Sequence, residues 1–311
     1  RNPFWGMPTN PATIVDELMG ELKEKSFAGI YCAMFERYAK WVDKPRWGEK
    51  TPNNLYFCKE ILEDFPGAKF ICVTRDGRDM SVDCMQADFG PTNIFVAAEN
   101  WAHSQAEAQS LRKHFPAETW LDVHYEDLVR EPEKLLREVC VFLDEEYEPA
   151  MLDFHQSPIA QARGKLRDHK PLGRPVTDEF IGMYRDKLSL FEQRIYAGVA
   201  GEVHKAEGYD LETEPLVVDE AEAARYRDQD DCFRAAQLAA PGGRVVMESY
   251  HDWVIDQREA RRQKGIWSEA DQPAGGLHED PFEDHITGVR APRDWKERLA
   301  LKRQYTGVGA V

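Results

Sequence analysis

The sequence predicts an α/β fold, a doubly wound parallel sheet flanked by helices and followed by a C-terminal extension. Helical and strand patterns alternate between residues 51 and 143, as expected when crossover helices connect parallel strands. The run Lys69–Thr74 is short, apolar and rich in β-formers, the pattern of a buried parallel strand. A chain of 311 residues can form one large domain, or one domain with an extension.

We expect three segments: an N-terminal helical segment (1–46), a core (47–212) and a C-terminal extension (213–311). In the first, Ile14, Leu18 and Leu22 mark an amphipathic helix, and residues 27–41 predict a second one.

The core opens with a cation in front of a helix. Thr51 is a suitable N-cap and Pro52 suits the first helical position, so Lys50 precedes a helix N-terminus. Free N–H groups, the helix dipole and an ammonium there favour an oxyanion. A Lys at this position is also often just a solvated surface residue.

A second cation follows the predicted strand at 69–74. Arg75 begins the turn Arg75–Asp79, which opens another helix. Ligands of open α/β sheets bind beyond the carboxyl ends of strands, where Arg75 stands. The alternative is a structural ion pair with Asp76 or Asp79. Two such junctions together suit a ligand with two separate phosphate groups.

The next elements follow from periodicity and composition. Apolar residues at helical spacing predict a helix over 93–115, and Trp120–Tyr125 reads as a strand that places Tyr125 at its carboxyl end. The remaining predicted helices span residues 132–143, 180–209, 244–263 and 294–305.

Several of these motifs resemble one family, the sulfotransferases that use 3'-phosphoadenosine 5'-phosphosulfate (PAPS), and in particular their bacterial and tyrosylprotein-type branches. About half of the chain is covered. The motifs are Gly48–Pro52, Phe65–Ile71, Arg75–Asp79, Val123–Val129, Pro132–Leu136 and Gly208-Tyr209.

The resemblance implies a P-loop NTPase-like sulfotransferase fold and assigns roles to residues. Lys50 would be the catalytic residue, stabilising charge on the leaving phosphate, and Lys50 and Thr51 would contact the cofactor. Arg75 would hold the 3'-phosphate. Tyr125 would lie against the adenosine, although an aromatic that packs the sheet edge explains it equally well.

Two positions depart from the family pattern. Asp83 stands in the cofactor site where the family has a Ser, eight residues after the strand-end Arg, and Ala87 replaces a further Arg of the tyrosylprotein-type members. A carboxylate about 4 Å from a phosphate repels it by roughly 4 kcal/mol per unit charge at an effective dielectric of 20. The 3'-phosphate would then be held differently, with Arg75, Arg78 and a basic loop compensating, or the cofactor site is altered.

The basic loop spans residues 161–177 and holds three arginines and two lysines among glycines and prolines. Charge runs are usually solvated surface. In so acidic a chain, however, such a loop can close over a phosphorylated ligand. The resemblance places a Lys-bearing loop here, and the best matches are Lys170 and then Lys165.

The family's Gly-Ser-Thr phosphate loop is not found in the sequence. Either the loop lies upstream of Arg1, as the start at Arg instead of Met favours, or the protein lacks this half of the cofactor site. No G-x-x-x-x-G-K-[ST] or G-x-G-x-x-G motif occurs.

Composition limits the classes of partner. The net charge of −16 argues against nucleic acid, and no apolar run is long enough for a membrane span. The six cysteines lack C-x-x-C spacing and read as buried free thiols of a cytoplasmic protein. Histidine spacing indicates no metal site.

The sequence therefore predicts a PAPS-dependent sulfotransferase that acts on a small-molecule or peptide hydroxyl or phenol and releases adenosine 3',5'-bisphosphate. Glu49, His103 and His124 are candidates for the general base, with Glu49 better suited to ordering its turn. The extension would wrap the core or build a homo-oligomer contact. The alternatives are a scaffold protein on the same fold and, less favoured, a nucleotide-dependent kinase.

Overall fold

The computed structural model describes residues 17–22, 26–87, 90–164 and 171–239. The chain divides into two units, residues 1–68 and residues 69–311, and each is described by itself. The predicted helices over 244–263 and 294–305, together with Lys165 and Lys170, lie outside the described residues.

The first unit is organised around an aromatic cluster. Helix α2 (Phe27–Trp41) is capped by Ser26, whose side chain accepts a hydrogen bond from the Gly29 N–H at 3.0 Å. Phe35 of α2 stacks on Trp47 with ring centroids 4.7 Å apart, and Phe65 meets Trp47 edge-on at 6.1 Å. These contacts fix the segment before Lys50 against α2.

The helix predicted after Thr51 starts differently from an α-helix. It opens as the 3₁₀-helix η1 (Pro52–Phe57) and continues as α3 (Cys58–Asp64). Thr51 precedes it with extended backbone, but its hydroxyl makes no capping bond. That hydroxyl instead donates to the Glu49 carboxylate, so the expected side-chain N-cap is wrong.

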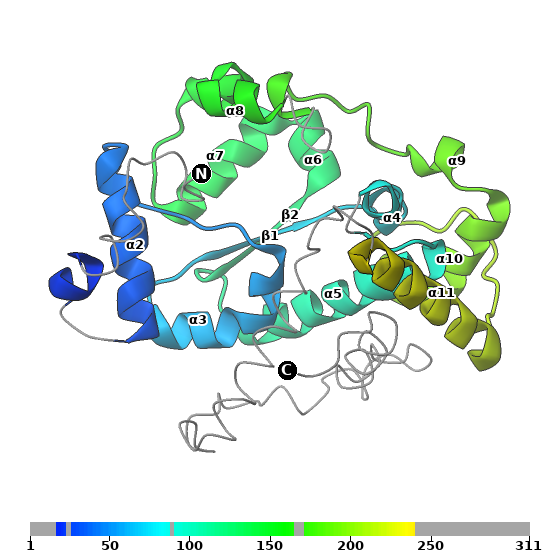
Figure 1. The fold of residues 1–311 in the computed structure, drawn as a ribbon. Helices are drawn as coiled ribbons and strands as arrows, with labels where there is room; N and C mark the ends of the chain where they lie inside the picture. Colours follow the sequence, from blue (N-terminus) through cyan, green and yellow to red (C-terminus); the bar gives the residue numbers. More distant parts are fainter. Residues whose placement is uncertain (1–16, 23–25, 88–89, 165–170, 240–311) are drawn as a thin grey trace, which may run out of the picture. The chain divides into compact units, whose positions relative to one another are not determined.

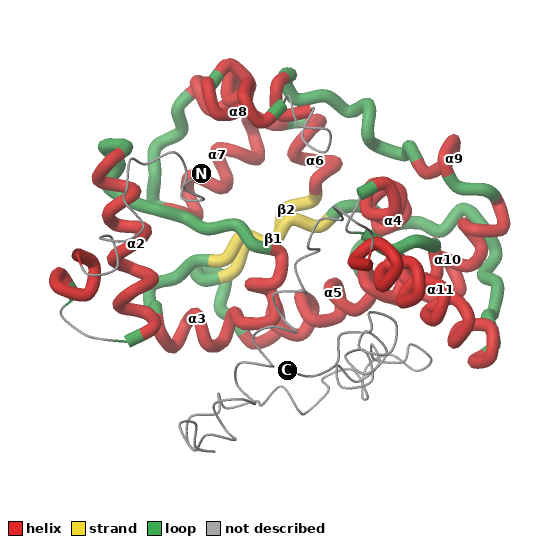
Figure 2. Tube along the Cα trace, viewed as in Figure 1, coloured by secondary structure: helices red, strands yellow, loops and turns green. Residues whose placement is uncertain are grey.

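The second unit contains a parallel pair of strands, β1 (Phe70–Thr74) and β2 (Trp120–His124). Phe70 pairs with Trp120 and Thr74 with His124, so both strands end at the same edge. Figure 2 shows this pair among helices. In the described residues the sheet has two strands, and a doubly wound sheet is not confirmed.

Strand β1 is covered less than predicted. Thr74 is buried, whereas Ile71 and Val73 on the alternate positions are 38% and 55% exposed. Side chains of a strand alternate between its two faces, so β1 is buried on one face only. The expectation of a fully buried strand was wrong, because an apolar run alone does not show that both faces are covered.

The core of this unit lies between helices (Figure 1). The long helix α5 (Ile94–His114) packs against α4 (Gly77–Gln86), α10 (Leu190–Ala206) and α11 (Glu220–Ala239). All six residues predicted to face inward on α5 are buried: Phe95, Ala98, Trp101, Ala102, Ala108 and Leu111. Helix α11 was not predicted, and its Ala223 joins this core.

The other elements of the unit are short, apart from α7. Their bounds are α6 (Tyr125–Arg130), α7 (Pro132–Leu143), η2 (Pro149–Gln156), α8 (Pro158–Arg163) and α9 (Tyr184–Lys187).

The helix predicted over 180–209 is two helices, α9 and α10. Ser189 separates them and caps α10 with Glu192 in a reciprocal capping box. Leu190 and Phe191 therefore occupy the first turn of α10 and are 65% and 54% exposed, not inward-facing as predicted.

All six cysteines are free, but they are not all buried. Cys58 and Cys140 are buried, three are intermediate, and Cys232 on α11 is exposed, which corrects the expectation for Cys232. Among the described helices, none has the length and apolar character needed to cross a membrane.

Candidate functional site

The structure brings Arg75 and Tyr125 together at the ends of the two strands. Arg75 follows β1 and Tyr125 follows β2, and the parallel register places both strand ends at one edge. The Arg75 guanidinium lies 4.8 Å from the centroid of the Tyr125 ring, a cation–π contact. The two side chains predicted at this edge of the sheet are therefore in contact.

Arg75 is held by partners from two other segments. Its Nη1 forms an ion pair with Asp83, two turns along α4, and its Nη2 donates to the Phe180 carbonyl at 2.8 Å. The Arg75 side chain is 13% exposed and that of Asp83 44%. Asp76 and Asp79, the partners expected for a structural pair, are not the ones Arg75 uses.

The surroundings of Tyr125 favour the neutral form of its phenol. Burial raises the pKa of the Tyr125 phenol, and this effect exceeds the opposing influence of the Arg75 charge. A neutral ring over a guanidinium gives a flat, half-buried surface of the kind on which a nucleotide base can stack.

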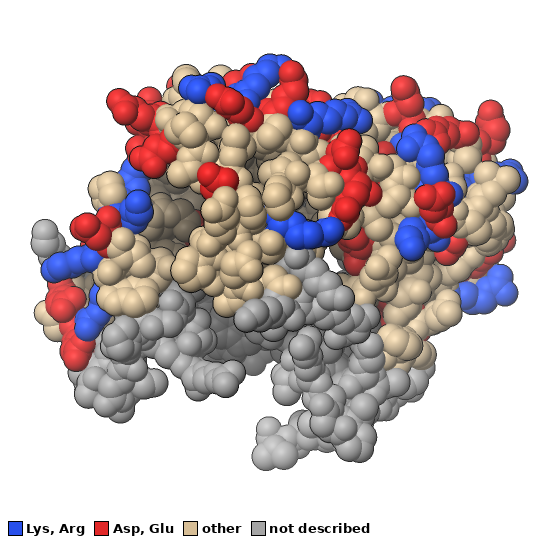
Figure 3. Space-filling model, turned by 90° about the horizontal axis from the view of Figure 1, so that it is seen from above, with Lys and Arg blue, Asp and Glu red and all other residues tan. Residues whose placement is uncertain are grey.

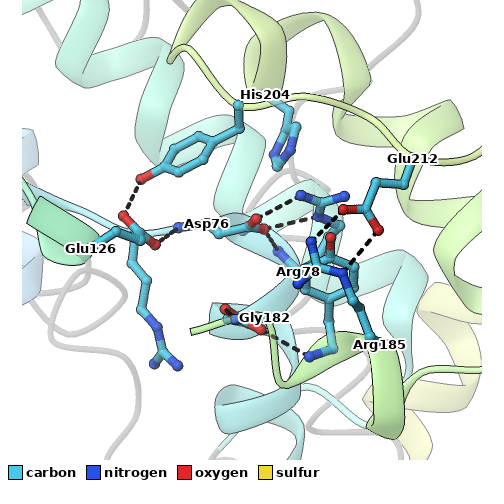
Figure 4. Close-up of polar contacts among 12 residues, drawn as sticks. Asp76, Arg78, Glu126, Gly182, Arg185, His204 and Glu212 are labelled. Carbon is cyan, nitrogen blue, oxygen red and sulfur yellow. Dashed lines mark hydrogen bonds and ion pairs between the residues drawn. The ribbon is translucent and has the colours of Figure 1, made fainter. Parts of the chain in front are cut away.

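The turn after Arg75 is held by its own charged residues. Asp76 caps α4 by accepting from the Arg78 N–H at 2.9 Å, and its carboxylate also receives Arg78 Nε at 3.0 Å and Nη2 at 2.7 Å. Figure 4 shows Arg78 turned toward Asp76. Arg78 is buried, and its guanidinium carbon lies 3.9 Å from the centroid of the Tyr184 ring. Because its guanidinium is paired with Asp76, Arg78 does not fit the predicted role of helping Arg75 to hold the 3'-phosphate.

Asp79 connects α4 to the segment that precedes α9. It is fully buried, and its carboxylate accepts the N–H groups of Gly182 at 2.6 Å and Tyr184 at 2.9 Å. Burial raises its pKa, and the two N–H donors oppose that shift. The same segment supplies the Phe180 carbonyl to Arg75, so α4 and residues 180–184 form one frame around the guanidinium.

Glu126 joins the two strand-end turns and was missed by the sequence reasoning. It is buried, its Oε1 accepts the Asp76 N–H at 2.9 Å, and its Oε2 accepts the Tyr209 hydroxyl at 2.8 Å. Figure 4 shows Glu126 on the opposite side of Asp76 from Arg78. Its position directly after the strand-end Tyr125 was the available signal, since polar residues at that edge meet the neighbouring turn.

Lys50 and Thr51 belong to the first unit. Lys50 is exposed. The Glu49 carboxylate beside it accepts from the side chains of Thr51 and Asn54, which agrees with the expected role of Glu49 in ordering this turn. The common cofactor contact of Lys50 and Arg75 stays a prediction.

The described part of the basic loop is partly ion-paired. Arg174 contacts Glu179 at 2.5 Å, and both side chains are about half exposed. In the face shown in Figure 3, basic and acidic side chains of the described residues are intermixed. The closing role predicted for Lys165 and Lys170 stays a prediction.

The region around Arg75 and Tyr125 is similar to known proteins. The model described as "Sulfotransferase family" matches residues 10–149, which include both predicted cation junctions and Tyr125. The match ends before the basic loop and α9–α11.

Three curated proteins are similar to the chain. Protein-tyrosine sulfotransferase 1 of Danio rerio is 30% identical over 178 residues, 53% of this chain and 49% of that protein. The protein-tyrosine sulfotransferase of Drosophila melanogaster is 28% identical over 125 residues, 39% of this chain and 25% of that protein. An uncharacterized protein of Aquifex aeolicus (strain VF5) is 29% identical over 142 residues, 43% and 18% of the two chains.

The chain thus spans about half or less of the length of these curated relatives. Over residues 10–149 the chain is similar to the sulfotransferase family, and its curated relatives include two protein-tyrosine sulfotransferases.

Proposed function

We propose that the chain transfers a sulfuryl group from PAPS to an acceptor hydroxyl or phenol. The observation that carries this proposal is the Arg75–Tyr125 pair, which lies at the shared carboxyl edge of two parallel strands inside the family segment. An aromatic ring at this edge suits the base of an adenosine nucleotide.

In the proposed reaction, the acceptor oxygen forms a bond to sulfur while the bridging bond from sulfur to the 5'-phosphate oxygen breaks. Adenosine 3',5'-bisphosphate leaves, and the hydroxyl proton passes to a base. Such transfers depend mainly on positioning and on charge stabilisation, because the transition state is loose. Lys50, an exposed ammonium before η1, would stabilise the charge that builds on the leaving phosphate.

We propose the acceptor class from the names of the relatives. Two of them are named protein-tyrosine sulfotransferases, which supports a phenol as the accepting group. An acceptor panel should therefore contain tyrosine peptides beside small phenols and alcohols.

The test is sulfuryl transfer from labelled PAPS by the 311-residue chain, comparing wild type with Lys50→Ala. Loss of one charged donor at the leaving group should lower kcat by about 10²–10³. Lys59→Ala on α3, which removes another exposed lysine of the same unit, is the matched control and should leave kcat unchanged. Equal turnover by wild type and Lys50→Ala would remove Lys50 from the mechanism.

One observation favours a second candidate, a binding protein on this fold without transferase activity. Asp83 already occupies the Arg75 guanidinium that the resemblance assigns to the 3'-phosphate. Calorimetry with adenosine 3',5'-bisphosphate distinguishes the two candidates, because the enzyme must bind this product and the scaffold need not.

A further inference from the structure

Both terminal nitrogens of the Arg75 guanidinium already have acceptors, and the third nitrogen is buried. Nη1 pairs with Asp83, and Nη2 donates to the Phe180 carbonyl at 2.8 Å and contacts the Met183 sulfur at 3.5 Å. The third nitrogen, Nε, is buried and has no hydrogen-bond partner in the described part of the chain. An incoming phosphate would therefore have to compete with the Asp83 carboxylate for the guanidinium.

The charges near the pair also disfavour a phosphate. One nearby cation, Arg75, lowers the pKa of the Tyr125 phenol, and three nearby carboxylates raise it: Asp83, Glu126 and Asp79. Arg78 does not alter this balance, because Asp76 neutralises it within the same turn. A dianionic group entering here would meet an excess of negative charge.

A hydroxyl group meets no such barrier. The Asp83 side chain is 44% exposed, whereas that of Arg75 is 13% exposed, so a ligand arriving from solvent meets the carboxylate before the guanidinium. An ionised carboxylate only accepts hydrogen bonds, and a ribose hydroxyl can donate to it while the ion pair stays intact.

We propose that Asp83 determines donor specificity by cancelling recognition of the 3'-phosphate. The site then accepts adenosine 5'-phosphosulfate, which has a free 3'-hydroxyl, at least as well as PAPS. Transfer from that donor forms the bond from acceptor oxygen to sulfur, breaks the bond from sulfur to the 5'-phosphate oxygen and releases adenosine 5'-monophosphate. The acceptor proton passes to a base, as in the reaction with PAPS. This inference rests on the proposed function.

The two product nucleotides test it by calorimetry on the 311-residue chain. Wild type should bind adenosine 5'-monophosphate at least as tightly as adenosine 3',5'-bisphosphate, because the added phosphate meets a neutralised guanidinium and an excess of carboxylates. Asp83→Ser, which frees Arg75, should raise the affinity for the bisphosphate at least about tenfold and leave that for the monophosphate unchanged. Asp83→Asn keeps the shape of the side chain and should show the same direction.

Glu133→Gln on α7 is the matched control. It removes one acidic charge from an exposed ion pair with Arg137, in the same unit, and should bind both nucleotides as wild type does. A wild type that prefers the bisphosphate tenfold or more, or Asp83 variants with wild-type affinity for it, would overturn the inference alone. If none of the variants bound either nucleotide, the proposed function would fail and this inference with it.

Discussion

His204 is surrounded by aromatic rings and fully buried. Its ring centroid lies 5.6 Å from that of Trp101, 5.4 Å from Tyr196 and 5.2 Å from Tyr209. Nδ1 is 3.1 Å from the Tyr196 hydroxyl, and Nε2 is buried. Burial lowers the pKa of this imidazole from 6.5 to about 4, so it is neutral in the folded protein at pH 7.

This histidine should make stability depend on pH. Between pH 6.5 and 4 the unfolded chain binds the proton and the folded chain does not, so stability falls as the pH decreases through this window. The expected loss is about 2 kcal/mol between pH 7.5 and pH 5. An NMR titration of the His204 ring checks the cause, and a midpoint near 6.5 would contradict it.

Gly77 is required because α4 begins against two aromatic side chains. A Cβ at this position would lie 2.0 Å from the Tyr196 hydroxyl oxygen and 2.4 Å from the Trp101 ring. Gly77→Ala should therefore lower the free energy of unfolding by about 3 kcal/mol through overpacking. Gly67→Ala, where an added Cβ meets nothing within 4 Å, is the control in urea denaturation. Equal stability of the two variants would show that the packing around Gly77 is looser.

At the scale of elements, Asp79 connects α4 to the start of α9 through two hydrogen bonds. It satisfies two N–H groups, one of them from Gly182, whose φ of +76° suits glycine. Asp79→Asn can accept one of these bonds at best and should cost about 2 kcal/mol. Hydrogen exchange should accelerate at residues 182–188 and stay unchanged in α7. Unchanged protection at residues 182–188 would show that other contacts hold the segment.

The bounds of helices were predicted correctly where apolar residues recur at helical spacing over a long stretch. They were predicted wrongly where a helix-capping sequence interrupts such a stretch. The helix predicted over 132–143 matches α7, and that over 93–115 matches α5 within one residue at each end. The break before α10 was missed, although Ser189 and Glu192 carry the spacing of a capping box. Apolar Leu190 and Phe191 concealed it because they fit a continuous helical pattern.

The site was predictable in part for a related reason. Strand ends are local features, so Arg75 and Tyr125 could be placed at one edge from sequence. The partners of Arg75 were not predictable, because Phe180 comes from a segment more than one hundred residues away. The role of Glu126 likewise depends on Tyr209, which approaches it only in the folded chain.

At the scale of the whole molecule, the two cation junctions fall in different units. Lys50 lies in residues 1–68 and Arg75 in residues 69–311. Contact of one nucleotide with both residues stays a prediction. In an acidic chain of net charge −16, a polyanionic nucleotide would be held by local cations, not by the general field of the protein.

The most direct measurement is a crystal structure of the 311-residue chain with adenosine 3',5'-bisphosphate. The account predicts the adenosine against Tyr125 and a 5'-phosphate oxygen within about 3 Å of Lys50 Nζ. A nucleotide bound away from Tyr125, or a Lys50 ammonium that points into a separate space, would contradict it.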